Sequence, residues 1–271
     1  MQRFAVVITI FLGLTVLGSA TPAVPETLTA LEEARQYGAP MAWIPDGAFM
    51  MGTRDASPKA TPGHRVYLYA FYMDIYEVTT ARYSKFLQAF GAAEPGFVPM
   101  FWDEIQFPYD GDRPVIGVSW TAAETYCRWA KKRLPTEAEW EKAARGTDDR
   151  RYPWGNDAPT SKLANYDQPF SGQRFSDSLK PVDSYEPGQS PYGVYGMAGS
   201  VSEWVADWYD ERYYATSPNS NPKGPASGAQ KVIRGGSFAD SAGALKSSSR
   251  GSSFPSDSAP FVGIRCARDA F

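Results

Sequence analysis

The chain contains 271 residues, of which 43% are hydrophobic, and its formal net charge is −3 at pH 7. This nearly balanced charge, without a cluster of Lys or Arg, gives no electrostatic basis for binding nucleic acid, so we expect no nucleic-acid partner. The 24 glycines, 22 prolines and 14% aromatic residues favour a loop-rich fold with many turns over a helical bundle.

The first 20 residues have the pattern of a secretory signal. Arg3 precedes an apolar run over residues 4–14, and Gly18-Ser-Ala20 supplies the small residues of a cleavage site. A membrane anchor is the alternative, but about 17 apolar-leaning residues that end in small residues fit a cleaved signal better. No cysteine follows the cleavage site, which argues against a bacterial lipoprotein. We therefore expect a periplasmic or secreted protein with no stable membrane insertion after signal removal.

After the signal, residues 21–40 are interpreted as a polar lead-in segment and residues 41–271 as one domain. Apolar residues alternate across Pro45-Asp-Gly47, which predicts a β-hairpin over residues 41–52. Alternation over residues 64–74 predicts one strand that is largely covered on both faces. Thr79 and Thr80 are expected to cap a helix with apolar residues at helical spacing.

A second helix is expected to follow Trp120 and to contain Cys127. Thr136-x-x-Glu139 is a capping box that predicts the start of a third helix, and Gly146 predicts its end. The remaining chain indicates short strands, turns and long loops, the longest over residues 210–230 and 241–260. The second of these segments is rich in serine and is interpreted as a solvated connection, although loops this long are often functional.

Seven short motifs occur along the chain in a fixed order. They are Trp43-Ile-Pro-x-Gly-x-Phe-x-Met-Gly52, His64-x-Val with Glu77-Val-Thr79, Pro114-Val with Val118-Ser-Trp120, Arg133-Leu-Pro-Thr-Glu-Ala-Glu-Trp140, Tyr152-Pro-Trp-Gly155, Gly199 with Glu203-Trp204, and Arg234-Gly-Gly-Ser-Phe238. Their order resembles the formylglycine-generating enzyme, or sulfatase-modifying factor, family over residues 41–269. The resemblance implies an α+β, C-type-lectin-like fold with short strands, few helices and much irregular structure. Such a likeness does not by itself establish an activity.

The chain has two cysteines, Cys127 and Cys266. Two cysteines in an exported protein suggest one disulfide, and two buried free thiols are the alternative. Their positions match a structural disulfide of the family, so the resemblance implies that they are bonded to each other. The bond would close a loop of about 139 residues, for which loop-closure entropy predicts a few kcal/mol of stabilisation.

The resemblance also identifies what this chain lacks. The family oxidises a substrate cysteine with oxygen, using copper held by two cysteine thiolates, but Asp240 and Leu245 stand near those two positions. Soft thiolates suit Cu(I), and neither an aspartate nor a leucine replaces them, so we expect no copper. Ser237 matches a serine that lines the family's active site, and Ser202 replaces an aromatic residue there. Ser237 and Asp240 are therefore the candidate catalytic residues of a groove whose original chemistry is lost.

His64 is the only histidine in the sequence. Sulfoxide synthases with a related fold hold iron with three histidines, so this chain cannot hold iron in that way. A Ser-His-Asp triad would have to use His64. The alternative is a structural role, which its place at the start of a strand beside Pro62-Gly63 favours.

Calcium is the ligand that the resemblance supports best. Related proteins bind it through backbone carbonyls and side-chain oxygens, which are the hard ligands that calcium accepts in irregular shells. By motif position, one site would use Asn165 and the carbonyl of Tyr166, with Asp177 as a partner whose alignment is poor.

A second calcium site would use the carbonyls of Gly199 and Val201 and the carboxylate of Glu203. The family usually has Asn or Asp where this chain has Gly196, so this site has lost one ligand. The alternative reading is that Glu203 only accepts backbone hydrogen bonds in a buried loop.

Three functions remain open at this point. The first is an exported accessory or maturation factor for a protein or peptide partner in the periplasm, without the family's oxidase reaction. The second is a periplasmic tailoring oxidoreductase of the pyoverdine-maturation type, which would use Asp240 or Glu203 for proton transfer in a groove without copper. The third is a lectin-like binding module that uses aromatic and acidic loops.

Overall fold

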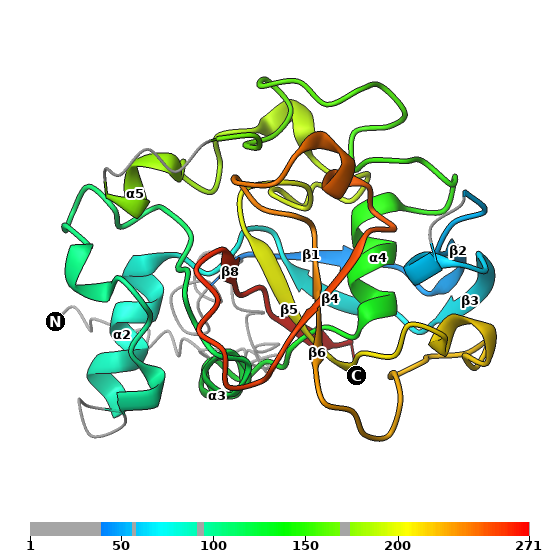
Figure 1. Ribbon diagram of the computed structural model, residues 1–271, viewed down its shortest axis with the longest axis horizontal. Helices are drawn as coiled ribbons and strands as arrows, with labels where there is room; N and C mark the ends of the chain where they lie inside the picture. Colours follow the sequence, from blue (N-terminus) through cyan, green and yellow to red (C-terminus); the bar gives the residue numbers. More distant parts are fainter. Residues whose placement is uncertain (1–38, 56–57, 91–94, 169–173, 271) are drawn as a thin grey trace, which may run out of the picture.

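The computed structural model describes residues 39–55, 58–90, 95–168 and 174–270, and Figure 1 shows their arrangement. The expected signal at residues 1–20, and the expected lead-in segment apart from its last two residues, lie outside this part of the chain. Within it, none of the helices is both long enough and apolar enough to cross a membrane.

The pairing of the first four strands differs from the pairing that the sequence predicted. They are β1 (Met41–Ile44), β2 (Gly47–Met51), β3 (His64–Leu68) and β4 (Phe71–Asp74). β1 pairs with β4 and β2 with β3, both antiparallel, so the predicted hairpin between β1 and β2 is wrong. Both pairs share one register, with Ile44 opposite Phe71 and Gly47 opposite Leu68, so the chain continues through Pro45-Asp46 and reverses only between Met51 and His64. Ile44, Phe49, Val66 and Phe71 from the four strands meet in one hydrophobic cluster.

The predicted single strand over residues 64–74 is divided. Residues 69 and 70 separate β3 from β4, which belong to different sheets. β4 also pairs with β9 (Ala267–Asp269), so the three-stranded sheet β1-β4-β9 joins the start of the described domain to its end.

The helices follow the capping signals closely. They are α2 (Thr80–Phe90), α3 (Trp120–Trp129), α4 (Glu137–Arg145) and the short α5 (Phe175–Ser178). Thr136 and Glu139 form the predicted capping box at the start of α4, and Gly146 ends the helix with a φ of 70°. Short 3-10 turns occur at Pro58–Ala60 (η1), Pro95–Phe97 (η2), Trp102–Glu104 (η3), Glu186–Gly188 (η4), Tyr213–Ala215 (η5) and Ala242–Leu245 (η6).

A second sheet has the strand order β7-β6-β5-β8. Its strands are β5 (Ser202–Trp208), β6 (Lys231–Arg234), β7 (Arg250–Ser253) and β8 (Val262–Gly263). β7 pairs with β6, and Ser247 and Ser248 just before it are buried. The serine-rich segment is therefore partly an edge strand packed on the core, and its interpretation as a solvated connection is wrong.

Two large hydrophobic clusters hold these elements together. One packs α4 against the first four strands, and the other packs α2 and α3 against β5 and β8. In Figure 1, α4 and the β2–β3 pair lie to the right of β5, whereas α2 and α3 lie to its left. Cys127 of α3 is bonded to Cys266, which precedes β9, and this confirms the expected disulfide.

Candidate functional site

The candidate catalytic pair lies directly after β6. The carboxylate of Asp240 accepts hydrogen bonds from the backbone N–H of Ser237 at 2.8 Å and from its hydroxyl at 2.7 Å. Asp240 is exposed, whereas Ser237 retains only 1% of its surface. The carboxylate thus closes the turn, and the serine hydroxyl is committed to it. The structure thus brings these two candidate residues into contact.

Leu245, the second residue at a copper-ligand position, points into the protein interior. Its side chain is fully buried in a cluster with Tyr152, Ala164 and Ala198. A Cβ at Gly236 would lie 3.2 Å from Leu245 Cδ2, so the turn after β6 packs tightly over it. The aliphatic side chain of Leu245 therefore occupies a position at which the family has a copper-binding thiolate. With Asp240 as the other donor and both cysteines in the disulfide, the residues present do not fit copper.

His64 is engaged away from this pair. Its Nδ1 lies 3.0 Å from the carbonyl oxygen of Pro62, and its ring packs edge-on against Tyr214 at 5.2 Å. Neither contact involves Ser237. These contacts fit the structural role rather than a catalytic triad.

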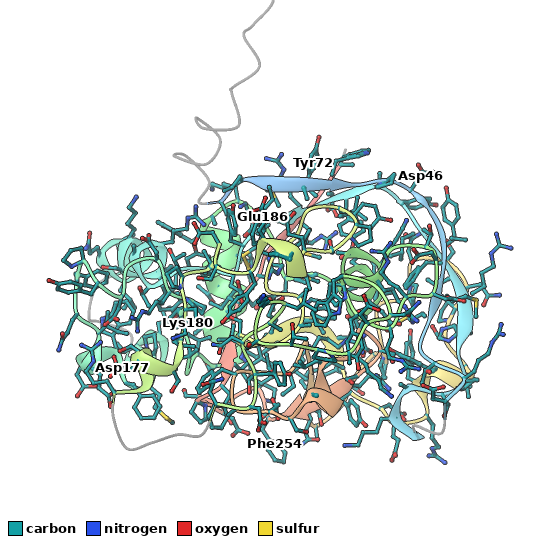
Figure 2. The ribbon with its side chains drawn as sticks, turned by 90° about the horizontal axis from the view of Figure 1, so that it is seen from above. Asp46, Tyr72, Asp177, Lys180, Glu186 and Phe254 are labelled. Carbon is teal, nitrogen blue, oxygen red and sulfur yellow. A yellow bond between two sulfur atoms is a disulfide. The ribbon has the colours of Figure 1, made fainter. Side chains whose placement is uncertain are left out.

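The residues expected at the first calcium site are only partly assembled. The amide nitrogen of Asn165 donates to the carbonyl of Ser178 at 2.9 Å, next to Asp177. The carboxylate of Asp177, however, pairs with Arg174 at 3.6 Å, and its side chain is 45% exposed. Figure 2 shows Asp177, a residue of α5, at the edge of the molecule. The Tyr166 carbonyl accepts a hydrogen bond from Gln168 at 3.0 Å.

The second expected site contains a strong internal ion pair. Glu203 is fully buried at the start of β5, and Arg265 binds its carboxylate at 2.7–3.0 Å. The indole N–H of Trp140 donates to the same carboxylate at 2.7 Å. Glu203 therefore already has partners, which are side chains rather than the backbone groups of the alternative reading, and any cation here must share it with Arg265.

Sequence reasoning missed a further carboxylate at this site, that of Glu77. Glu77 is 1% exposed, and neither of its oxygens accepts a hydrogen bond of good geometry, although weak contacts with the Ser200 hydroxyl and the backbone lower its pKa slightly. Its nearest charged partner is Arg265, at 3.8 Å. Burial raises the pKa of Glu77 to about 7; the charge of Glu203 raises it as well, whereas Arg265 opposes the shift. Without a metal ion, the site would therefore contain the carboxylates of Glu77 and Glu203 and only one guanidinium group, that of Arg265, to balance their charge.

Gly196 explains why Glu77 can occupy this position. A Cβ at residue 196 would overlap the carboxylate of Glu77, and the φ of 67° at this glycine is strained for other residues. The position where the family usually has Asn or Asp therefore lies against a different oxygen donor. The buried and poorly hydrogen-bonded oxygens of Glu77 fit a hard cation, and the motif Glu77-Val-Thr79 was the sequence signal that could have revealed them.

Within the described ranges, no three His, Cys, Asp or Glu side chains form a metal-ligating group. Any calcium here would therefore depend on backbone carbonyls as well as carboxylates, which is the donor set expected from the sequence. The metal residues stay a prediction.

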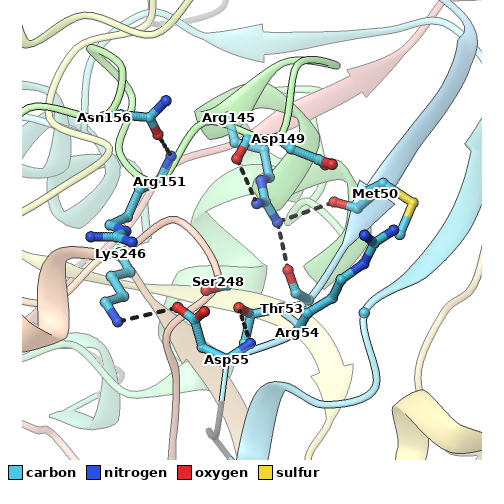
Figure 3. Close-up of a pocket in the computed structure, with 12 residues that line it drawn as sticks. Met50, Thr53, Arg54, Asp55, Arg145, Asp149, Arg151, Asn156, Lys246 and Ser248 are labelled. Carbon is cyan, nitrogen blue, oxygen red and sulfur yellow. Dashed lines mark hydrogen bonds and ion pairs between the residues drawn. The ribbon is translucent and has the colours of Figure 1, made fainter.

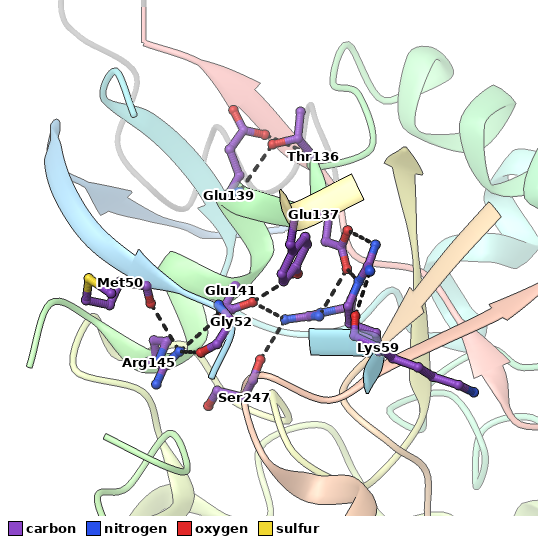
Figure 4. Close-up of polar contacts among 12 residues, drawn as sticks. Met50, Gly52, Lys59, Thr136, Glu137, Glu139, Glu141, Arg145 and Ser247 are labelled. Carbon is purple, nitrogen blue, oxygen red and sulfur yellow. Dashed lines mark hydrogen bonds and ion pairs between the residues drawn. The ribbon is translucent and has the colours of Figure 1, made fainter. Parts of the chain in front are cut away.

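The arginine of the motif Arg234-Gly-Gly-Ser-Phe238 has a structural task. Its guanidinium is fully buried, pairs with Glu137 at 3.1 Å and with Glu141 at 2.6 Å, and donates to the carbonyl of Ser247 at 2.7 Å (Figure 4). Glu137 also pairs with Arg250 of β7 at 2.7 Å. This network ties α4 to β6 and β7 and so fixes the turn that carries Ser237.

Comparisons with known proteins agree with this architecture. The model of the Sulfatase-modifying factor enzyme 1-like domain matches residues 27–270. The formylglycine-generating enzyme of Streptomyces coelicolor is 35% identical, over 84% of this chain and 88% of that protein. The inactive C-alpha-formylglycine-generating enzyme 2 of Mus musculus is 30% identical, over 85% of this chain and 86% of that protein.

Two further similar proteins show how much of each relative this chain covers. The serine/threonine-protein kinase pkn1 of Chlamydia caviae is 34% identical over 84% of this chain, but the chain spans only 38% of that kinase. The solved structure of PvdO from Pseudomonas aeruginosa superposes with a TM-score of 0.70 and 27% identity, over 84% of this chain and 94% of that one. The fold is thus the α+β, C-type-lectin-like fold that the motifs implied.

Proposed function

Because the chain belongs to the formylglycine-generating enzyme, or sulfatase-modifying factor, family, we propose that it is an exported member without the copper-dependent oxidase reaction. It would serve as an accessory or maturation factor for a protein or peptide partner in the periplasm. The observation that carries this proposal is the replacement of both copper thiolates. Asp240 closes a turn through Ser237, Leu245 fills the interior, and the two cysteines are bonded to each other.

The experiment that tests the loss of oxidase activity uses the family's own reaction. The purified protein is incubated with Cu(I), oxygen and a peptide containing Cys-x-Pro-x-Arg, and the peptide is analysed by mass spectrometry. We expect no aldehyde above a control without protein. The Streptomyces coelicolor enzyme, treated in parallel, is the positive control. Aldehyde formed by this chain would refute the proposal and return it to the oxidases.

A tailoring oxidoreductase of the pyoverdine-maturation type is the second candidate, and the likeness to PvdO favours it. In that case Asp240 is the better proton-transfer residue, because it is exposed, whereas Glu203 is buried and bound to Arg265. The test is whether the protein changes the mass of a pyoverdine precursor peptide and whether Asp240→Asn abolishes the change. A peptide that keeps its mass would remove this candidate.

We also propose that calcium acts as a structural ion in this protein. The support is the pair of buried carboxylates Glu77 and Glu203, whose negative charge Arg265 only partly offsets. When bound, calcium would supply the missing positive charge and let Glu77 and Glu203 stay ionised in the interior.

A further inference from the structure

A pocket with excess positive charge lies at the C-terminal end of α4. Its volume is about 210 Å³, and it is formed by the loop after β2, the turn after α4 and the segment after η6 (Figure 3). Its charged lining residues are Arg54, Arg145, Arg151, Lys246, Asp55 and Asp149. Four cations therefore face two carboxylates. None of these residues belongs to the candidate catalytic pair or to the expected calcium sites.

Hydrogen bonds hold the side chain of Arg145 in place at the back of the pocket. Its side chain is 8% exposed, and its Nη1 donates to the carbonyls of Met50 and Gly52 at 3.1 and 2.7 Å and to Glu141 at 2.8 Å. By contrast, Nη2 has one long contact, 3.4 Å to the carbonyl of Asp149, and the buried Nε has no partner. Part of this guanidinium's donor capacity is therefore unused, which is costly for a buried charged group.

The charge behind Arg145 is not balanced either. The buried network contains three guanidinium groups, those of Arg145, Arg234 and Arg250, against the carboxylates of Glu137 and Glu141. The interior next to the pocket thus carries one positive charge more than its carboxylates offset. Low-dielectric surroundings strengthen the field of this charge at the pocket.

Two more arginines stand at the rim with free guanidinium groups. In the described part of the chain, no side chain or carbonyl accepts a hydrogen bond from the guanidinium of Arg54 or Arg151, and both residues are exposed. Lys246 pairs only loosely with Asp55, at 3.7 Å. In Figure 3, Arg54 and Arg151 lie on opposite sides of Arg145. An anion bound between these cations would reduce their mutual repulsion.

We propose that this pocket binds a small molecule through an oxyanion group, either a carboxylate or a phosphate. The planar guanidinium fork matches both groups in a bidentate manner, and charge-assisted hydrogen bonds of this kind are among the strongest in proteins. The pocket is smaller than the roughly 300–1,000 Å³ of typical ligand sites, so the ligand is about the size of a small acid or phosphate ester.

The test is calorimetric titration of the full chain with inorganic phosphate, sulfate and citrate, at constant ionic strength set with chloride. We expect saturable binding of at least one of these anions. Arg54→Gln and Arg151→Gln should each weaken it by about tenfold or more, because each removes a charge-assisted contact. Both residues are exposed, so the variants should fold, which circular dichroism checks.

Arg128→Gln on α3 is the matched control, because it removes an exposed arginine far from the pocket and should leave the affinity unchanged. Tighter binding of citrate than of phosphate identifies a carboxylate ligand, and the reverse order identifies a phosphate ligand. Titrations without saturable heat for all three anions, or equal affinity in the pocket variants and the wild type, would overturn the proposal.

Discussion

At the residue scale, the two positions that lost their thiolates have taken on opposite structural tasks. Asp240 remains at the surface and closes a turn, whereas Leu245 joins the hydrophobic interior. The sequence revealed the loss, because a missing cysteine is visible in one letter. It did not reveal what replaced the site, because the packing of Leu245 against Tyr152 and Ala198 depends on segments far apart in the chain.

The burial of Leu245 leads to a stability prediction. Leu245→Ala should lower the free energy of unfolding by about 2–5 kcal/mol, since it removes fully buried methyl groups and leaves a cavity. Urea unfolding followed by circular dichroism measures the change. Leu163→Ala, at a half-buried leucine, is the control and should cost clearly less. A cost for Leu245→Ala no larger than that of the control would show that this side chain does not fill the interior.

Asp207 provides a second prediction at this scale. Its carboxylate is buried and accepts the backbone N–H of Glu137 at 2.8 Å. Burial, and then the charge of Glu137, raises the pKa of Asp207 to about 8. The folded chain thus keeps a proton that the unfolded chain releases above pH 4, so the contribution of Asp207 to stability falls as pH rises toward 8.

Asp207→Asn keeps the hydrogen-bond acceptor but removes this ionisation. The difference in free energy of unfolding between pH 5 and pH 8 should therefore change by on the order of a few kcal/mol, with the variant losing less stability on going to pH 8. Urea titrations at the two pH values measure it. The exposed Asp103→Asn should behave as the wild type. Parallel pH profiles for Asp207→Asn and the wild type would contradict the assignment.

At the scale of helices and strands, short sequence motifs predicted features that depend only on residues close together in the chain. The capping box of Thr136 and Glu139 set the start of α4 because its two hydrogen bonds span three residues. Pro45-Asp-Gly47 suggested a chain reversal that does not occur there, since β1 and β2 follow one another along the same register opposite β4 and β3. Glu77 was likewise missed because its isolation depends on Gly196, which is distant in sequence and adjacent in space.

The disulfide is an element-scale constraint, because it joins α3 to the chain just before β9 across 139 residues. Replacing both Cys127 and Cys266 with Ala should lower the free energy of unfolding by about 2–5 kcal/mol. Denaturant unfolding measures this loss, and a reductant should destabilise the wild type without affecting the double variant. Free thiols in the denatured, unreduced wild type would contradict the bond.

At the scale of the whole molecule, the fold buries an unusual amount of charge. Arg234, Arg265, Glu77, Glu141 and Glu203 are all at most 1% exposed. Such ion pairs contribute little net stability, but breaking one leaves an isolated buried charge at a cost of about 3–5 kcal/mol. The motifs that identified the family include several of these residues. They specify this charged interior more than they specify any reaction, which is why the fold was predictable and the function was not.

The last prediction concerns calcium and the stability of the entire domain. A ligand that binds only the folded state stabilises it by about 2.7 kcal/mol at 100 times its dissociation constant, which corresponds to a rise in Tm of roughly 5–10 °C for a chain of this size. A chelator should therefore lower the Tm, and added calcium should restore it.

Glu77→Gln should remove the calcium response without lowering the Tm in chelator, because the amide no longer places a second negative charge beside Glu203. Glu124→Gln, on the outer face of α3, is the control and should respond to calcium as the wild type does. Melting curves of the wild type that coincide with and without chelator would exclude calcium as a structural ion, and a full calcium response in Glu77→Gln would place the ion away from this carboxylate.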